Sequence, residues 1–324
     1  MAKGSGGTVL VPAFFVICGF IMLGAGAEMM VSGSSRLAIR WGVSPLIVGL
    51  TIVAFGTSAP ELAVSIESTT SNLSALALGN VIGSNIANIG LVLGILALIK
   101  PIRIERQLVR KQIPLVIISS MLMGVLLLDG QLDLSDGLFL TMGLLGYLII
   151  SYRQAAVEFN AQELELHPAQ HKRHSGRTLF YLVLIIAGLS LLVFSSRIFV
   201  VNVITLARLL GISEAVIGLT LVAVGTSIPE LATSLVAAAK NQADIAIGNV
   251  VGSNIFNVLC VLGITAIIGT VYGDQFAVAD FTVMILFSLV LLPFAWTSFT
   301  LSRMEGLFLL SGYVVYLVFV SQQA

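Results

Sequence analysis

The sequence predicts an all-α integral membrane protein in which ten transmembrane helices form two inverted five-helix repeats. Three observations predict this fold class: the composition, the number of apolar segments and an internal duplication. Of the 324 residues, 57% are hydrophobic and only 10% are charged, and the mean hydropathy is +1.05. Soluble domains average about 25% charged residues. We therefore expect the lipid bilayer as the main partner, and the formal net charge of zero argues against nucleic acid.

The apolar segments have the length that a membrane span requires. A helix needs about 20 mostly apolar residues to cross the hydrocarbon core. Ten segments meet this requirement, and two of them are long and interrupted by proline. They cover residues 9–31, 44–70, 75–99, 113–129, 135–152, 178–201, 213–238, 245–269, 277–297 and 304–321.

The distribution of charge predicts the orientation. Ten spans place both termini on one side, and 13 of the 16 Lys and Arg residues lie in segments that follow odd-numbered spans. The basic side faces the cytoplasm by the positive-inside rule. We therefore expect a multi-pass membrane protein with both termini outside. The polar insert 153–177 is expected as a solvated cytoplasmic loop. Its histidines, His167, His171 and His174, do not form a closed set of metal ligands.

An internal duplication relates the two halves of the chain. Residues 46–94 align without a gap with 215–263, and 26 of the 49 aligned positions are identical. Because each unit holds an odd number of spans, the second copy enters the bilayer from the opposite side, as in inverted-repeat transporters. We therefore predict a first repeat over 1–152, a linker over 153–177 and a second repeat over 178–324.

Each copy places a glutamate beside a proline in the middle of an apolar segment. The motifs are "GTSAPE", which ends in Glu61, and "GTSIPE", which ends in Glu230. A charge at the bilayer centre costs roughly 3 kcal/mol, so its presence suggests a function. Pro60 and Pro229 lack an N–H and each should free a backbone carbonyl in the preceding turn. Inverted-repeat transporters bind their substrates where such helices are broken.

Hydroxyl and carboxamide groups accompany each glutamate at helical spacing. Thr57 and Ser58 precede Glu61 by four and three residues, so they share its face of the helix. This all-oxygen set contains no His or Cys, and it suits Ca²⁺ or Na⁺ better than zinc or copper. A protonated glutamate in an interhelical hydrogen bond is the structural alternative, and the repetition of the whole set argues against it. The set comprises Glu61, Thr57, Ser58, Ser84 and Asn88, and Glu230, Thr226, Ser227, Ser253 and Asn257.

These motifs resemble the two alpha repeats of the cation/calcium exchanger superfamily, in particular those of prokaryotic sodium/calcium exchangers. The resemblance rests on "GTSAPELAVSI" with "GNVIGSNIANIGLVLG" and on "GTSIPELATSL" with "GNVVGSNIFNVLCVLG". It implies that Glu61 and Glu230 are the central calcium ligands and that Asn88 and Asn257 complete the cluster. It also implies sodium sites beside them, with spans 1 and 6 sliding against the other eight, and a location in the plasma (inner) membrane. The sodium ligands would be Thr57, Ser58, Ser84, Thr226, Ser227 and Ser253, together with the backbone carbonyls of Ala54 and Ala223.

The chain departs from the family pattern in two places. Some members carry an acid at the position of Asn257, whereas both equivalent positions are Asn here, which argues against potassium co-transport. Glu28 has Arg197 as its counterpart in the second repeat, so this acid is not duplicated. We expect Glu28 at a mouth of the site or in an ion pair with Arg36.

The sequence thus predicts a secondary active antiporter, and not an enzyme, that exchanges Na⁺ for Ca²⁺ by alternating access and extrudes Ca²⁺ without a cofactor. An exchanger of protons for Ca²⁺ or another divalent cation is the first alternative, and the duplicated hydroxyl pairs favour sodium over it. A cation channel is the second, against which the broken inverted repeats argue. An intramembrane hydrolase with two glutamates as acid and base is the third, and it leaves the duplicated hydroxyls without a purpose.

Overall fold

The predicted fold class is confirmed by the computed structural model, which describes residues 5–71, 73–165, 176–211, 223–273 and 278–322. Within these residues, nine helical segments are long and apolar enough to cross a membrane. They coincide with nine of the ten predicted spans. The remaining span, predicted over 213–238, is described from Ala223 onward, as α11 (Ala223–Thr226) and α12 (Ile228–Ala239).

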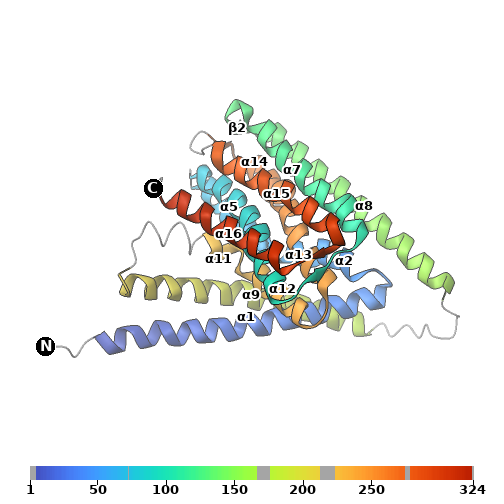
Figure 1. The fold of residues 1–324 in the computed structure, drawn as a ribbon, viewed down its shortest axis with the longest axis horizontal. Helices are drawn as coiled ribbons and strands as arrows, with labels where there is room; N and C mark the ends of the chain where they lie inside the picture. The colour runs from blue at the N-terminus through green and yellow to red at the C-terminus, as the bar shows by residue number, and fades with distance from the viewer. Residues whose placement is uncertain (1–4, 72, 166–175, 212–222, 274–277, 323–324) are drawn as a thin grey trace.

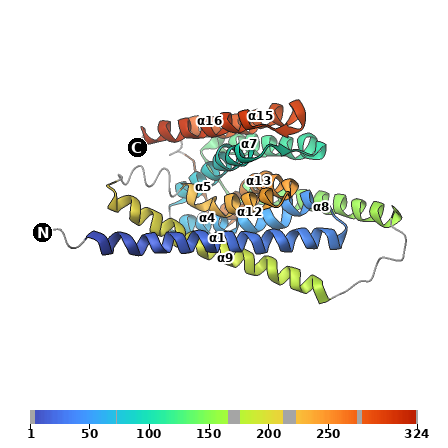
Figure 2. The same cartoon turned by 60° about the horizontal axis from the view of Figure 1, so that its bottom comes forward.

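The helices form three layers (Figure 2). One outer layer holds the two longest helices, which lie side by side. The opposite outer layer holds the last two helices of the chain and one helix of the first repeat. The middle layer contains the helices that carry the duplicated motifs. In order from one face to the other, the layers are α1 (Ser5–Trp41) with α9 (Gly176–Leu209); α4 (Ala59–Thr70), α5 (Ser74–Ala87), α12 and α13 (Ala243–Phe256); and α7 (Ile113–Leu126), α15 (Val278–Ser298) and α16 (Arg303–Ser321).

The ends of the helices agree with the predicted topology. The beginning of α1 and the end of α16 lie at the same end of the molecule (Figure 1). The end of α8 (Leu134–Glu165) and the beginning of α9 lie at the opposite end. The insert expected as a loop is partly helical, because α8 continues to Glu165 through a stretch without Gly or Pro. The three histidines of this insert lie outside the described residues.

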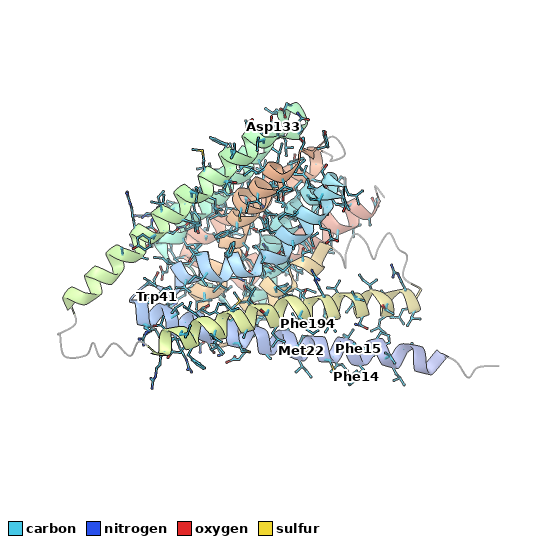
Figure 3. The ribbon with its side chains drawn as sticks, turned by 180° about the vertical axis from the view of Figure 1, so that it is seen from behind. Phe14, Phe15, Met22, Trp41, Asp133 and Phe194 are labelled. Atoms are coloured by element: carbon cyan, nitrogen blue, oxygen red, sulfur yellow. The ribbon has the colours of Figure 1, made fainter. Side chains whose placement is uncertain are left out.

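The two long helices exceed their predicted lengths of 9–31 and 178–201. They contain 37 and 34 residues. At 1.5 Å per residue each is about 50 Å long, well above the ~30 Å of the hydrocarbon core. They therefore tilt steeply or project beyond the bilayer. Figure 3 shows the large side chains along them, and those that are exposed suit a lipid-facing surface: Phe14, Phe15, Trp41 and Phe194.

A seam of glycines holds α1 and α9 together. The glycines recur every seven residues, and so do the side chains that they face on α9. A Cβ atom on Gly26 would lie 2.9 Å from the carbonyl oxygen of Gly188, so only glycine permits this approach. The pairs are Gly19 with Phe199, Gly26 with Leu192 and Gly33 with Ile185.

Irregular turns interrupt the helices that carry the motifs. The first motif helix consists of α2 (Pro45–Val48), a π-helical turn η1 (Gly49–Val53), α3 (Ala54–Thr57) and α4, with the break between α3 and α4 at Ser58. The next helix also contains a π-helical turn, and π-helical turns frequently mark functional sites. Its elements are η2 (Asn88–Leu93) followed by α6 (Gly94–Ile99), and the equivalents in the second repeat are η7 (Asn257–Leu262) followed by α14 (Gly263–Ile268). The connections η3 (Leu108–Gln112) and η4 (Leu127–Asp129) flank α7.

Two short antiparallel sheets link the repeats, which an all-α prediction does not include. The strand β1 (Ile102–Arg103) pairs with β4 (Thr300–Leu301), and β2 (Gln131–Leu132) pairs with β3 (Val271–Tyr272). The connection after the third span thus meets that after the ninth, and the connection after the fourth meets that after the eighth. This exchange is what a two-fold axis in the membrane plane requires of inverted repeats.

Candidate cation-binding site

The two glutamates lie in the first turns of equivalent helices. Glu61 is the third residue of α4, and Glu230 is the third residue of α12. A proline precedes each, in the part of a helix where a missing N–H costs nothing. The first turn of a helix lies at the positive end of the helix dipole, which favours a carboxylate. Both side chains are 0% exposed.

The first motif reaches the second glutamate across the repeats. The Ser58 hydroxyl of the first repeat donates to Oε1 of Glu230 (3.4 Å), and the Ser253 hydroxyl donates to the same oxygen (3.5 Å). A buried pair of like charges is costly unless a cation or protons neutralise it.

The predicted hydroxyl groups also meet across the repeats. The hydroxyl of Thr57 donates to Oδ1 of Asn249 (2.9 Å) and lies 3.4 Å from Oγ of Ser253. In the equivalent place, the hydroxyls of Ser84 and Thr226 lie 3.2 Å apart. The structure therefore brings each of these four predicted residues into contact with the other repeat.

The carboxamides of Asn88 and Asn257 each bond to a second asparagine. Nδ2 of Asn88 donates to Oδ1 of Asn254 (3.2 Å), and Nδ2 of Asn257 donates to Oδ1 of Asn85 (3.1 Å). The second asparagine belongs to the opposite repeat in both pairs. All four side chains are buried.

Several buried oxygens of this cluster have no hydrogen-bond partner among the described residues. Buried polar atoms are normally paired, so such a group of orphans calls for a ligand. Carboxylate, carboxamide and hydroxyl oxygens are the donors that hard cations prefer, and two carboxylates balance one divalent charge. No group of three or more His, Cys, Asp or Glu that could hold a metal occurs in the described part of the chain. The orphans are Oε1 and Oε2 of Glu61, Oε2 of Glu230, Oδ1 of Asn88, Oδ1 of Asn257 and Oγ of Ser227.

The backbone carbonyls are more occupied than the sequence suggests. The carbonyl of Gly225, which Pro229 frees, accepts a hydrogen bond from the Ser196 hydroxyl of α9 (3.2 Å). The carbonyl of Ala54 accepts from the backbone N–H of Ser58 (3.0 Å) and from the Thr57 hydroxyl (3.4 Å). The role of Ala54 as a sodium ligand stays a prediction. So does that of Ala223, the first residue of α11.

Two further asparagines brace the glutamates, and the sequence reasoning did not include them in the site. Nδ2 of Asn80 donates to the backbone carbonyl of Glu61 (3.2 Å) and to Ser65 Oγ (3.1 Å). Nδ2 of Asn249 makes the same contacts with Glu230 (3.3 Å) and Ser234 Oγ (2.9 Å). The sequence held a signal for these contacts, because Asn80 and Ser65 have Asn249 and Ser234 as their equivalents in the second repeat. Asn85 and Asn254 are equivalent in the same way.

Glu28 forms an ion pair with Lys240. The pair with Arg36, one of the two expectations for Glu28, does not occur among the described residues. Lys240 also donates to the hydroxyl of Ser32 (2.7 Å), and Gln242 donates to that of Ser35 (2.8 Å). These bonds tie α1 to the turn between α12 and α13. Sequence spacing gives no sign of them, since more than 200 residues separate the partners.

The two repeats are not packed equivalently. Along α12, Ala232 and Val236 pack into an apolar cluster with Leu23 and Met30 of α1. The equivalent face of α4 is exposed, at Ala63, Val64 and Glu67. Within the described residues, α1 therefore packs closely against α12, whereas the equivalent face of α4 is not covered in this way.

Comparisons with known proteins agree with this architecture. The chain matches the family described as "Sodium/calcium exchanger protein" over residues 11–153 and 180–322. Inner membrane protein YrbG of Escherichia coli (strain K12) is 37% identical over 314 residues, which cover 95% of this chain and 96% of that protein. Sodium/calcium exchanger MaX1 of Methanosarcina acetivorans is 32% identical over 353 residues and covers 96% and 98%.

A solved structure shares the whole fold. The sodium-calcium exchanger NCX_Mj, soaked with 10 mM Na⁺ and zero Ca²⁺, superposes with a TM-score of 0.83 at 32% identity, covering 96% of this chain and 99% of that one. The family match falls in two segments, one in each half of the chain. The chain belongs to the sodium/calcium exchanger family.

Proposed function

We propose that the protein is a secondary active antiporter that exchanges Na⁺ for Ca²⁺ across the plasma (inner) membrane and extrudes Ca²⁺. One observation carries the proposal. Two fully buried carboxylates occupy equivalent positions, and the same cluster contains buried oxygens of both carboxylates and of the carboxamides of Asn88 and Asn257 that have no partner among the described residues. A Ca²⁺ ion between Glu61 and Glu230 would balance both charges. Several Na⁺ ions at the flanking hydroxyls would compete for the same negative charge.

Coupling follows from the cost of the empty site. Two unneutralised carboxylates in a low-dielectric core are expensive to move past apolar side chains. The change between inward-facing and outward-facing states is therefore favoured when cations occupy the site, and binding shifts the population between states only through such differential stability. An inward sodium gradient then drives Ca²⁺ outward.

The moving part would be the α1–α9 pair. The glycine seam makes these helices a single unit, and the hydroxyl of Ser196 on α9 reaches the broken motif helix at Gly225. A slide of this pair along the middle layer would exchange the closed α1–α12 contact for an α9–α4 contact. The basic side of the chain, which includes Lys240, would be cytoplasmic.

The test is uptake of radioactive calcium into proteoliposomes loaded with Na⁺, K⁺ or acid and diluted into sodium-free buffer. We expect uptake only with internal Na⁺, and its loss in Glu61→Gln. Ser120→Ala is the control, because this buried hydroxyl contacts Ser288 between α7 and α15 and is not one of the proposed ligands.

Other outcomes would redirect the proposal. Uptake driven by the pH gradient alone would assign proton coupling, with the carboxylates as proton carriers. Flux in unit-conductance steps in a bilayer recording would assign a channel. Undiminished exchange by Glu61→Gln would contradict the role given to the carboxylates.

A further inference from the structure

Two carboxamide pairs cross the pseudo-two-fold axis beside the glutamates. We infer that Asn85 and Asn254 are positioning residues, which turn the side-chain oxygens of Asn257 and Asn88 toward the transported cation. The inference rests on the proposed function and adds two residues that touch no cation themselves.

A carboxamide presents two ends of similar size and opposite effect on a cation. Its oxygen is a ligand, whereas its NH₂ group is a donor that a cation repels. A rotation by half a turn about the last side-chain bond exchanges the two ends. Asn88 and Asn257 therefore serve a cation only if something holds each NH₂ group away from it.

The structure supplies that restraint twice. Oδ1 of Asn254 accepts from Nδ2 of Asn88 (3.2 Å), and Oδ1 of Asn85 accepts from Nδ2 of Asn257 (3.1 Å). In both cases the remaining oxygen, Oδ1 of Asn88 or Asn257, is buried and has no partner among the described residues. Nδ2 of Asn254 is also buried without a partner among the described residues, so the orientation of Asn254 is less restrained than that of Asn85.

The orientation of Asn85 is itself restrained. Its NH₂ group points to the sulfur of Met284, with Nδ2 and Sδ 3.8 Å apart, so its oxygen is left for Asn257. Asn88 and Asn257 begin the π-helical turns η2 and η7. Asn85 lies three residues before Asn88 on the same helix, yet each bonds to the opposite repeat.

The first experiment measures Ca²⁺ affinity by calorimetric titration of the purified protein. Asn85→Leu removes the acceptor at similar volume, and Asn85→Asp keeps an acceptor oxygen. Changes to residues that orient metal ligands typically weaken metal affinity about ten- to hundredfold. We expect a loss of this size in Asn85→Leu and affinity near or above wild type in Asn85→Asp. Should Asn85→Leu fail to fold, Asn85→Ala removes the same acceptor without added bulk.

A double-mutant cycle separates positioning from general damage. Asn85→Leu should have little further effect in a protein that already carries Asn257→Ala, because the ligand it orients is gone. In the Asn88→Ala background its effect should persist in full. Asn254→Leu should show the reverse pattern. Simple disruption of the helix predicts instead that Asn85 couples to its neighbour Asn88.

The outcomes are distinguishable from those of the proposed function. If Glu61→Gln abolishes Ca²⁺ binding while Asn85→Leu binds like wild type, the inference is overturned and the proposed function stands. Equal losses in Asn85→Leu and Asn85→Asp would also overturn it, as would coupling to Asn88. If the wild-type protein binds neither Ca²⁺ nor Na⁺, the proposed function and the inference fail together.

Discussion

At the scale of single residues, the central fact is that Glu61 and Glu230 are buried with unsatisfied oxygens. A carboxylate in such a place destabilises the cation-free protein, because burial without a partner costs free energy. A bound cation neutralises the carboxylates and so stabilises the folded protein. The protein should therefore report occupancy of its site through its stability.

We expect Ca²⁺ to raise the Tm of the wild-type protein and to have little effect on Glu61→Gln or Glu230→Gln. A ligand at a hundred times its Kd stabilises the folded state by about 2.7 kcal/mol. The Gln variants should remain folded without Ca²⁺ and be at least as stable as wild type, because one buried charge is removed. Thermal unfolding monitored with and without Ca²⁺ measures this. A Ca²⁺-dependent rise in Tm as large in a Gln variant as in the wild-type protein would exclude the replaced glutamate as a Ca²⁺ ligand.

The hydroxyl of Thr57 belongs to the same scale. Thr57→Val keeps the shape of the side chain and removes the donor that bonds to Asn249. We expect Na⁺ affinity to fall more than Ca²⁺ affinity, because the hydroxyls flank the carboxylates. The sodium dependence of calcium uptake, measured beside Ca²⁺ titrations, gives both quantities. The same change at Thr226, whose hydroxyl contacts Ser84, tests whether the two repeats contribute equally.

At the scale of elements, the α1–α9 pair depends on close backbone approach. A Cβ atom at Gly26 would lie 2.9 Å from the Gly188 carbonyl oxygen, whereas one at Gly24 on the same helix would have no atom within 4 Å. The seam is thus specific to one face of α1. Lipid offers no hydrophobic driving force between the helices, so packing of this kind must hold them.

We expect Gly26→Ala to destabilise the protein and to lower transport, while Gly24→Ala leaves both near wild type. Overpacking of a close contact costs typically about 1–3 kcal/mol. Unfolding midpoints and calcium uptake of the two variants, prepared in parallel, provide the comparison. Wild-type stability in Gly26→Ala would contradict the claim that close backbone approach at Gly26 stabilises the α1–α9 pair.

At the scale of the whole molecule, the described structure is asymmetric about its pseudo-two-fold axis. The ion pair of Glu28 with Lys240 and the bond from Gln242 to Ser35 hold α1 against the turn that ends α12. At the equivalent positions of α9, Arg197 and Ile204 stand in place of Glu28 and Ser35. Among the described residues, these polar contacts therefore have no counterpart at the equivalent positions of α9.

Removal of these polar contacts should shift the protein toward the state that is open on the side of the Lys240 turn. In Lys240→Met, we expect a cysteine introduced at Ser35 to react faster with a membrane-impermeant maleimide applied from that side. Lys111→Met removes an exposed lysine elsewhere and serves as the control. Exposed ion pairs contribute at most about 1 kcal/mol, so the expected change is a few-fold in rate. An unchanged rate would show that the apolar α1–α12 contact closes this side alone.

The sequence by itself determined the spans, the duplication and the residues that carry the site. Apolar length is a local property, and an alignment at constant offset identifies equivalent positions, so nine described spans and the glutamate motifs follow without coordinates. Equivalence does not predict contact. Only the tertiary structure decided that Asn88 bonds to Asn254, that Lys240 pairs with Glu28, and that β1 joins β4. These partners depend on how the helices cross and on the register of one repeat against the other, which are set by side-chain packing over the whole molecule.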